Sequence, residues 1–184
     1  MENKPFTISA FPRSGTRYVA TILLKHGIPC THEGYHPQHL KIMPPLTHNL
    51  VSSVVTDWAK EWRYEHTTNL YLVRNPYEVI KSWTTLRPQH RAALYNWYKT
   101  QGFEETWVAS VEFGEKLAKA IIKVEEFESA WEDVIAYLGY PEVRLKYSPR
   151  NRINSNIENE RYGRIEIDET PEFLTLVEKY GYNR

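Results

Sequence analysis

The sequence predicts an α/β protein with a central parallel sheet, covered by helices on both faces in three α/β/α layers. Short apolar runs of strand length alternate along the chain with segments of helical periodicity, an alternation typical of parallel sheets. Two passages from strand to helix carry clear turn and cap residues. Because 184 residues support one well-buried core and are few for two, we expect a single domain over residues 1–184.

The first predicted strand is the apolar run Phe6–Phe11, which lies between Pro5 and Pro12. An amphipathic helix follows, with apolar residues spaced three to four apart on one face. Gly27 comes directly after its last basic residues, which is typical of a helix C-terminus. The apolar residues of this face are Tyr18, Val19, Ile22 and Leu23.

Four further apolar runs predict the remaining strands, at Ile28–Thr31, Leu50–Thr56, Leu70–Val73 and Ile121–Val124. After the run that ends at Val73, Asn75 is the expected cap of a helix whose first residue is Pro76.

Three more helical patterns follow along the chain. Residues 89–119 are mostly helical in pattern, and a second apolar face is closed by Gly139. The last helix starts at Thr170-Pro171. The second apolar face consists of Phe127, Trp131, Val134, Ile135 and Leu138, and the last helix buries Phe173, Leu176, Val177 and Tyr180. Residues 142–164 have no clean period and an excess of basic residues, and we interpret them as a solvated charged loop.

The bulk composition restricts the class of partner. The formal net charge is +0, so no global field draws the protein to nucleic acid or to an acidic membrane. The single cysteine, Cys30, forms no internal disulfide and fits a reducing compartment. The polar start has no signal-peptide pattern, and no apolar run reaches membrane-spanning length. We therefore expect a cytoplasmic protein with no membrane partner and a local anion site.

The turn at Pro12–Thr16 is the first candidate for that site. A strand that turns through Ser-Gly-Thr into a helix points backbone N–H groups and the positive helix end at one spot. Arg13 and Arg17 add two permanent charges. The nucleoside-triphosphate P-loop pattern with its Gly-Lys-Ser/Thr is missing, and we expect no metal because the arginines supply the charge. The alternative is a solvent-facing turn in which Ser14 or Thr16 only caps the helix.

Arg74 and Ser82 form the second candidate. The arginine stands at a strand end and the serine two turns into the next helix. A guanidinium binds a phosphate through two parallel hydrogen bonds, and a hydroxyl donates a third. Alternatively, Arg74 pairs with a surface carboxylate and Ser82 is an ordinary helix residue.

Together the two units resemble the sulfotransferases that use 3′-phosphoadenosine 5′-phosphosulfate (PAPS). That family has Pro-Arg/Lys-Ser/Thr-Gly-Thr after its first strand and Val-Arg-Asp/Asn-Pro before a helical serine, as at Pro12–Thr16 and Val73–Ser82 here. The ending Tyr180–Tyr182 is similar to bacterial and phage-type members. The resemblance implies a P-loop NTPase-like fold and an EC 2.8.2 activity, with sulfuryl transfer to a hydroxyl or amine acceptor and adenosine 3′,5′-bisphosphate as product.

The resemblance also implies roles for individual residues. Arg74 and Ser82 would hold the 3′-phosphate, which distinguishes PAPS from ATP. Arg13 would in addition stabilise the charge on the bridging oxygen as sulfur leaves phosphate. The residues implied to hold the 5′-phosphosulfate are Arg13, Ser14, Gly15, Thr16 and Arg17.

A base must accept the acceptor's proton during transfer. His32 and Glu33 follow the second predicted strand, at the same sheet edge as the first loop. In the family branches with Pro-Arg-Ser-Gly-Thr a glutamate in a similar place is the base, so the resemblance favours Glu33, with His32 as orienting neighbour or substitute. His48 is a third candidate. Alternatively, Glu33 is structural and pairs with Arg13 or Arg17.

Two other functions stay open from the sequence. A phosphotransferase of the wider P-loop class would need magnesium ligands and would bind ATP better than the bisphosphate. A non-catalytic nucleotide-binding or partner-binding module would keep the phosphate site without turnover. The sequence leaves the acceptor and the oligomeric state undetermined.

Overall fold

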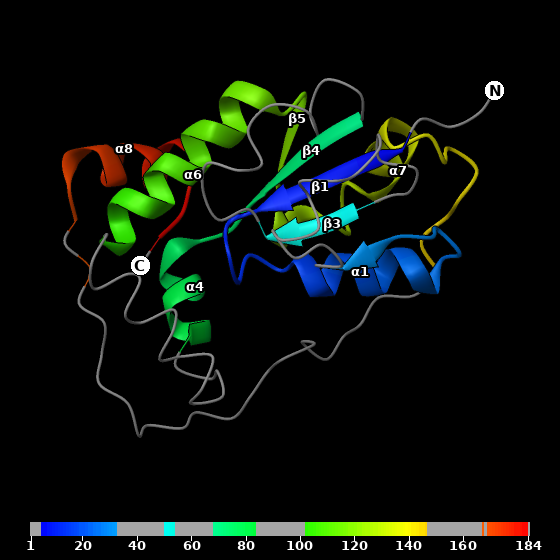
Figure 1. Cartoon of the computed structure of the whole chain (residues 1–184), viewed down its shortest axis with the longest axis horizontal. Helices are drawn as coiled ribbons and strands as arrows, with labels where there is room; N and C mark the ends of the chain where they lie inside the picture. The colour runs from blue at the N-terminus through cyan, green and yellow to red at the C-terminus, as the bar shows by residue number, and fades with distance from the viewer. Residues whose placement is uncertain are drawn as a thin grey trace, which may run out of the picture.

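The computed structural model describes residues 5–32, 50–53, 68–83, 102–146, 167 and 169–183. Within them the strands form one parallel sheet in the order β2-β3-β1-β4-β5, flanked by helices, and the predicted α/β class is confirmed (Figure 1). The strands are β1 (Phe6–Ala10), β2 (Thr31–His32), β3 (Leu50–Ser53), β4 (Thr68–Val73) and β5 (Ala120–Lys123). The helical elements are α1 (Thr16–Lys25), α4 (Pro76–Trp83), α6 (Phe103–Leu117), the 3₁₀ turn η2 (Val124–Glu126), α7 (Trp131–Tyr137) and α8 (Pro171–Lys179).

Strand β1 lies at the centre of the sheet, between β3 and β4, and is fully buried. Ser9 is level with Ser52 on one side and with Tyr71 on the other. The strands that follow β1 in the sequence, β2 and β3, lie on one side of it in the sheet. The chain then crosses over, and β4 and β5 lie on the other side of β1. The strand order therefore reverses between β1 and β4, and ligands of open α/β sheets bind at such a switch point.

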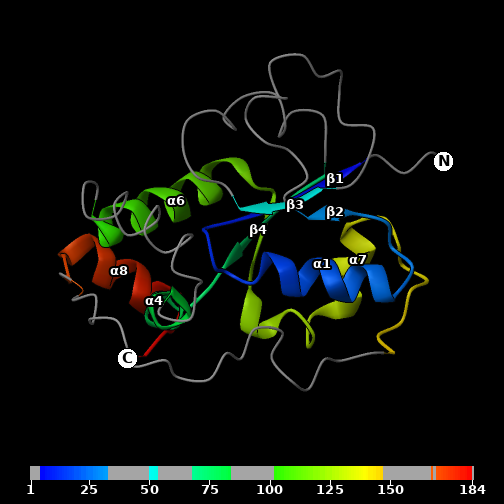
Figure 2. The same ribbon diagram turned by 60° about the horizontal axis from the view of Figure 1, so that its bottom comes forward.

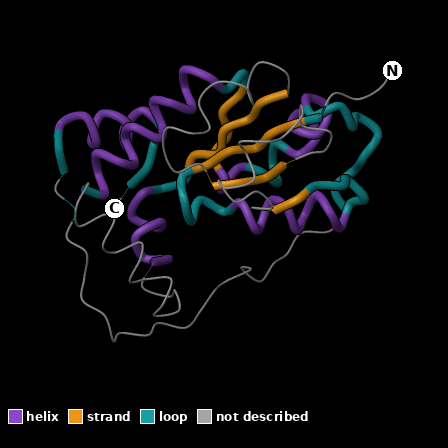
Figure 3. Tube along the Cα trace, in the orientation of Figure 1, coloured by secondary structure: helices purple, strands orange, loops and turns teal. Residues whose placement is uncertain are grey.

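Alternate residues of the strands enter two separate hydrophobic cores. Ile8 and Leu70 pack with α1 and α7, whereas Tyr71 and Val73 pack with α4, α6 and α8. Since neighbouring residues of a strand point to opposite faces, both faces of the sheet are covered. Figures 2 and 3 show α1 and α7 together, apart from α6 and α8.

Helix α6 approaches β4 at a glycine. A Cβ atom on Gly114 would lie 2.4 Å from Cγ of the Tyr71 ring. Tyr71 is fully buried, and its hydroxyl lies 2.7 Å from Oγ of Ser110 one turn earlier in α6. The ring is therefore fixed at both ends, and the helix packs on it only because position 114 has no side chain.

The structure shifts several predicted boundaries. The second strand begins at Thr31, because Ile28 is buried and its N–H closes the end of α1 on the Leu23 carbonyl oxygen at 3.0 Å. The fifth strand begins at Ala120, and its predicted last residue Val124 opens η2 instead.

The helical predictions meet the structure in part. The pattern over residues 89–119 contains α6, while residues 84–101 lie outside the described part. Both predicted apolar faces, on α1 and around α7, are in the core, apart from Tyr18, which packs against it half-buried. In α8, Thr170 caps the helix as expected, and Tyr180 is half-buried rather than buried. Of the segment 142–164, residues 142–146 are described and form no helix or strand.

No helix in the described ranges is long and apolar enough to cross a membrane.

Gly114→Ala should lower the free energy of unfolding by about 1–3 kcal/mol, because the added methyl group overlaps the fixed Tyr71 ring. The better helix propensity of alanine offsets part of that loss. Glu112→Ala on the exposed side of the same helix is the control and should change stability by less than about 0.5 kcal/mol. Urea unfolding of both variants measures this, and equal stabilities would contradict the close packing.

Candidate anion site at the switch point

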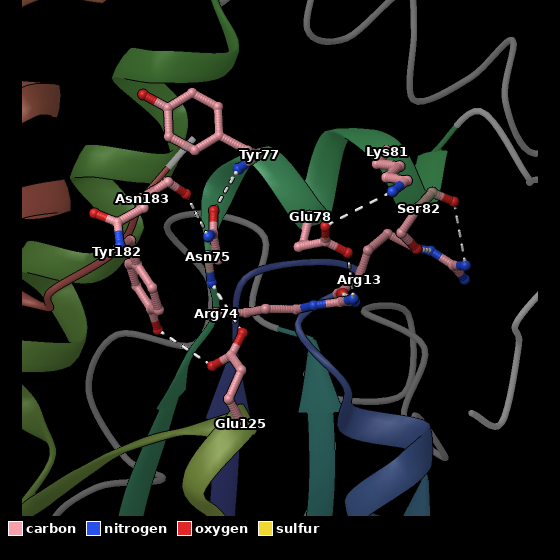
Figure 4. A network of polar contacts seen from close by, with 10 residues as sticks. All are labelled: Arg13, Arg74, Asn75, Tyr77, Glu78, Lys81, Ser82, Glu125, Tyr182 and Asn183. Carbon is pink, nitrogen blue, oxygen red and sulfur yellow. Dashed lines mark hydrogen bonds and ion pairs between the residues drawn. The ribbon is translucent and has the colours of Figure 1, made fainter. Parts of the chain in front are cut away.

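The candidate site lies where β1 and β4 end side by side. The loop 11–15 leads from β1 into α1, and Arg74 with Asn75 leads from β4 into α4. Because parallel neighbours end at the same sheet edge, the two sequence motifs meet there. Figure 4 shows residues of both motifs, together with Glu125 and the C-terminal residues Tyr182 and Asn183.

Two residues of the first loop have left-handed backbone conformations. Arg13 has φ 70° and is the only residue other than glycine with a positive φ in the described ranges, and Gly15 has φ 83°. A left-handed conformation costs a residue with a Cβ atom about 1–2 kcal/mol. The loop is closed by a hydrogen bond of 3.0 Å from Ser14 N–H to the carbonyl oxygen of Phe11.

Gly15 is required by space as well as by conformation. A Cβ atom there would lie 2.5 Å from Cγ2 of Val124, at the start of η2. The loop therefore passes directly over Val124, the first residue after β5. The shape of the loop depends on that contact.

The N-terminus of α1 differs from those of the other described helices in its capping. Its N-cap residue Gly15 makes no side-chain hydrogen bond, and its first turn holds no acid. By contrast, Asn75 caps α4 and Thr170 caps α8, and α6 and α7 carry acids in their first turns. The positive dipole end of α1 thus has neither a side-chain cap nor an acidic residue beside it, unlike those of the other described helices.

The two motif arginines make contacts across the site. Arg74 donates from Nη1 to the carbonyl oxygen of Arg13 at 2.8 Å. Arg13 in turn donates from Nε to Oγ of Ser82 at 3.0 Å and from Nη2 to the Ser82 carbonyl oxygen at 3.4 Å. Each arginine therefore contacts the other motif, which fixes the first loop to α4.

Glu78 lies between two cations, Arg74 and Lys81. Oε2 of Glu78 lies 3.9 Å from Nη2 of Arg74, one turn along α4, and Oε1 lies 4.0 Å from Nζ of Lys81. These are long, partly exposed pairs, worth little to stability. An anion with more charge than one carboxylate would compete well for the Arg74 guanidinium.

The other predicted site residues differ in exposure. Thr16 is buried, and its Oγ1 lies 3.2 Å from Nε2 of His32, whereas Arg17 is exposed at the start of α1. The hydroxyl of Ser14 is fully buried with no hydrogen-bond partner in the described part of the chain. The structure thus brings Arg13, Gly15 and Thr16 together with Arg74 and Ser82, and it turns the Ser14 hydroxyl inward.

Two candidate bases, Glu33 and His48, lie outside the described residues. Val124 and Glu125, which no sequence motif indicated, also lie at the site, against Gly15 and Asn75. The signal that could have found them is position, since they follow β5 and so lie at the same sheet edge. Within the described ranges no three His, Cys, Asp or Glu side chains gather to hold a metal ion.

Comparison with known proteins finds distant likeness to solved structures. No family model matches the sequence, and no curated protein matches it. Mouse sulfotransferase SULT7A1, crystallised in complex with PAP, is similar to this chain with a TM-score of 0.46 and 17% sequence identity. The match covers 76% of this chain and 60% of that one, so the chain spans less than two thirds of that structure. A likeness this distant does not bear on the chemistry of the site.

Gly15→Ala should destabilise the fold through the left-handed backbone and through overlap with Val124. The two causes separate in a Val124→Ala background, where the overlap is relieved and the conformational cost of about 1 kcal/mol stays. Thermal or urea unfolding of the two single variants and the double variant measures the difference. An equal cost of Gly15→Ala in both backgrounds would show that the loop does not press on Val124.

Proposed function

We propose that the protein is a PAPS-dependent sulfotransferase of the EC 2.8.2 type, with a P-loop-like three-layer fold over a single domain. The observation that carries the proposal is the contact of its two phosphate motifs, made by the 2.8 Å hydrogen bond from Arg74 to the Arg13 carbonyl oxygen. One nucleotide with phosphate groups at both ends spans such a pair of sites. A nucleotide with a single phosphate chain would leave the second phosphate site unoccupied.

The 5′-phosphosulfate would bind at the N-terminus of α1, which has no side-chain cap. The N–H groups of its first turn, the hydroxyl of Thr16 and the charges of Arg13 and Arg17 would hold it. The left-handed conformation of Arg13 supports this role, since strained backbone is concentrated at functional sites. The Ser14 hydroxyl would have to turn out of its buried position to join them.

The 3′-phosphate would bind to Arg74 and Ser82. Its double charge would displace the 3.9 Å pairing of Arg74 with Glu78. Ser82 accepts a hydrogen bond from Arg13, and a hydroxyl that accepts one bond can still donate another. The two residues would thus distinguish a 3′-phosphorylated nucleotide from ATP.

PAPS supplies a sulfuryl group activated by its bond to phosphate. The acceptor oxygen or nitrogen attacks sulfur in line as the sulfur–oxygen bond to the 5′-phosphate breaks. Glu33 would take the acceptor's proton, and Arg13 would stabilise the negative charge left on the phosphate oxygen. His32, whose Nε2 lies 3.2 Å from Oγ1 of Thr16, would orient the base or replace it.

Binding selectivity tests the proposal. Adenosine 3′,5′-bisphosphate at a hundred times its dissociation constant should stabilise the fold by about 2.7 kcal/mol, and ATP with or without magnesium should do less. Arg74→Gln should weaken bisphosphate binding about 10- to 100-fold, since it removes a charged hydrogen-bond donor. Lys81→Gln, the same charge change on an exposed residue of α4, is the control and should have little effect. Tighter binding of ATP with magnesium would instead favour a phosphotransferase.

Replacing the three candidate bases in turn tests catalysis. Glu33→Gln should reduce sulfuryl transfer from PAPS by about 100-fold or more, the usual contribution of a positioned base, and leave bisphosphate binding intact. His32→Gln and His48→Gln should have smaller effects. Transfer can be followed with labelled PAPS and a panel of hydroxyl and amine acceptors. Background turnover that none of the three variants changes would support a non-catalytic binding module.

A further inference from the structure

Asn75, which directly follows Arg74, uses all four of its polar groups. Within α4, its Oδ1 accepts from Tyr77 N–H and its carbonyl oxygen from Val79 N–H, both at 3.0 Å. Its own N–H donates to Oε1 of Glu125 at 3.3 Å, and its Nδ2 donates to the carbonyl oxygen of Asn183 at 2.9 Å (Figure 4). The two accepted bonds belong to the start of α4, so the two donated bonds are the ones that hold the turn to distant parts of the chain.

The two distant anchors are joined to each other. Glu125 is 50 residues from Asn75 and lies in η2, while Asn183 is 108 residues away and follows α8. Tyr182 donates from its hydroxyl to Oε2 of Glu125 at 3.5 Å, and burial, followed by the charge of Glu125, raises the pKa of Tyr182. Lys123 donates to the carbonyl oxygen of Tyr180 at 3.3 Å. We name residues 182–183 the tail. Glu125 and the tail therefore form one unit that packs against the turn at Arg74 and Asn75.

We propose that Glu125 and the tail are positioning elements for Arg74, so that the second phosphate site is complete only with the tail docked. This inference rests on the proposed function. Arg74 shares a peptide bond with Asn75, so a rotation of that peptide displaces the guanidinium at the end of its long side chain. Bidentate phosphate binding requires close alignment of the donors, and a few tenths of an ångström matter.

The negative charge of Glu125 separates a positioning role from a purely electrostatic one. A carboxylate near a phosphate site repels the ligand, so its removal alone should tighten binding. If Glu125 positions Arg74, its removal should weaken binding in spite of the lost repulsion. Glu126 provides the matched control, because it is the next residue, carries the same charge and pairs with Lys123 at 2.6 Å rather than with Asn75.

Calorimetric titration with adenosine 3′,5′-bisphosphate and with adenosine 5′-monophosphate tests the proposal on the full chain. The ratio of the two affinities isolates the contribution of the 3′-phosphate. In Glu125→Ala, and in a variant that ends at Gly181, the ratio should fall about fivefold while monophosphate binding is unchanged. In Glu126→Ala the ratio should stay or rise. Asn183→Ala should also keep it, because the bond uses the main-chain carbonyl.

A ratio that stays or rises in Glu125→Ala would overturn the positioning role and leave the sulfotransferase proposal intact. If the wild-type protein itself shows no preference for the bisphosphate, the proposed function fails. Amide hydrogen exchange then tests separately whether Glu125 and the tail hold the turn at Asn75. The Tyr77 and Val79 amides, which both bond to Asn75, should exchange faster in the two variants than in Glu126→Ala. Unchanged exchange would overturn the proposal.

Discussion

The parallel pairing of β1 with β4 is the constraint on which the site depends. It brings the loop after Ala10 and the turn after Val73 to one edge of the sheet, where Arg74 reaches the main-chain oxygen of Arg13. The sequence separates these two arginines by 61 residues, and no local preference would join them. The order of the described strands reverses at this pair, and ligands of open α/β sheets bind at such a switch point.

The two cores explain why the first loop is strained. Phe11, the first residue of the loop, is buried in the core that contains α6 and α8, whereas α1, after the loop, packs in the opposite core. Residues 12–15 therefore cross from one face of the sheet to the other within a few residues. The chain makes this crossing with two left-handed residues, and η2 limits the space beneath it. Packing on both sides thus fixes the N-terminus of α1, which has no side-chain cap, at the place where an anion is expected.

Local patterns predicted most of the fold, and tertiary contacts account for what they missed. The strand–turn–helix units were predictable because apolar runs, Asn75 and Pro76 act on neighbouring residues, and the Oδ1 bond of Asn75 confirms its cap. The second strand begins later than its apolar pattern predicts, because Ile28 packs in the hydrophobic core and does not pair in the sheet. The inward turn of the Ser14 hydroxyl, the Arg13–Ser82 contact and the role of Glu125 depend on residues far apart in sequence. Neither the periodicity nor the spacing of residues in the sequence predicts such contacts.

The proposed function requires one nucleotide to bind with its two phosphate ends on the two motifs. A crystal structure of the protein with adenosine 3′,5′-bisphosphate would show whether it does. We expect the 5′-phosphate at the first turn of α1 and the 3′-phosphate about 3 Å from the Arg74 guanidinium and the Ser82 hydroxyl. A bisphosphate bound elsewhere, or bound with its 3′-phosphate in solvent and Arg74 still on Glu78, would contradict it.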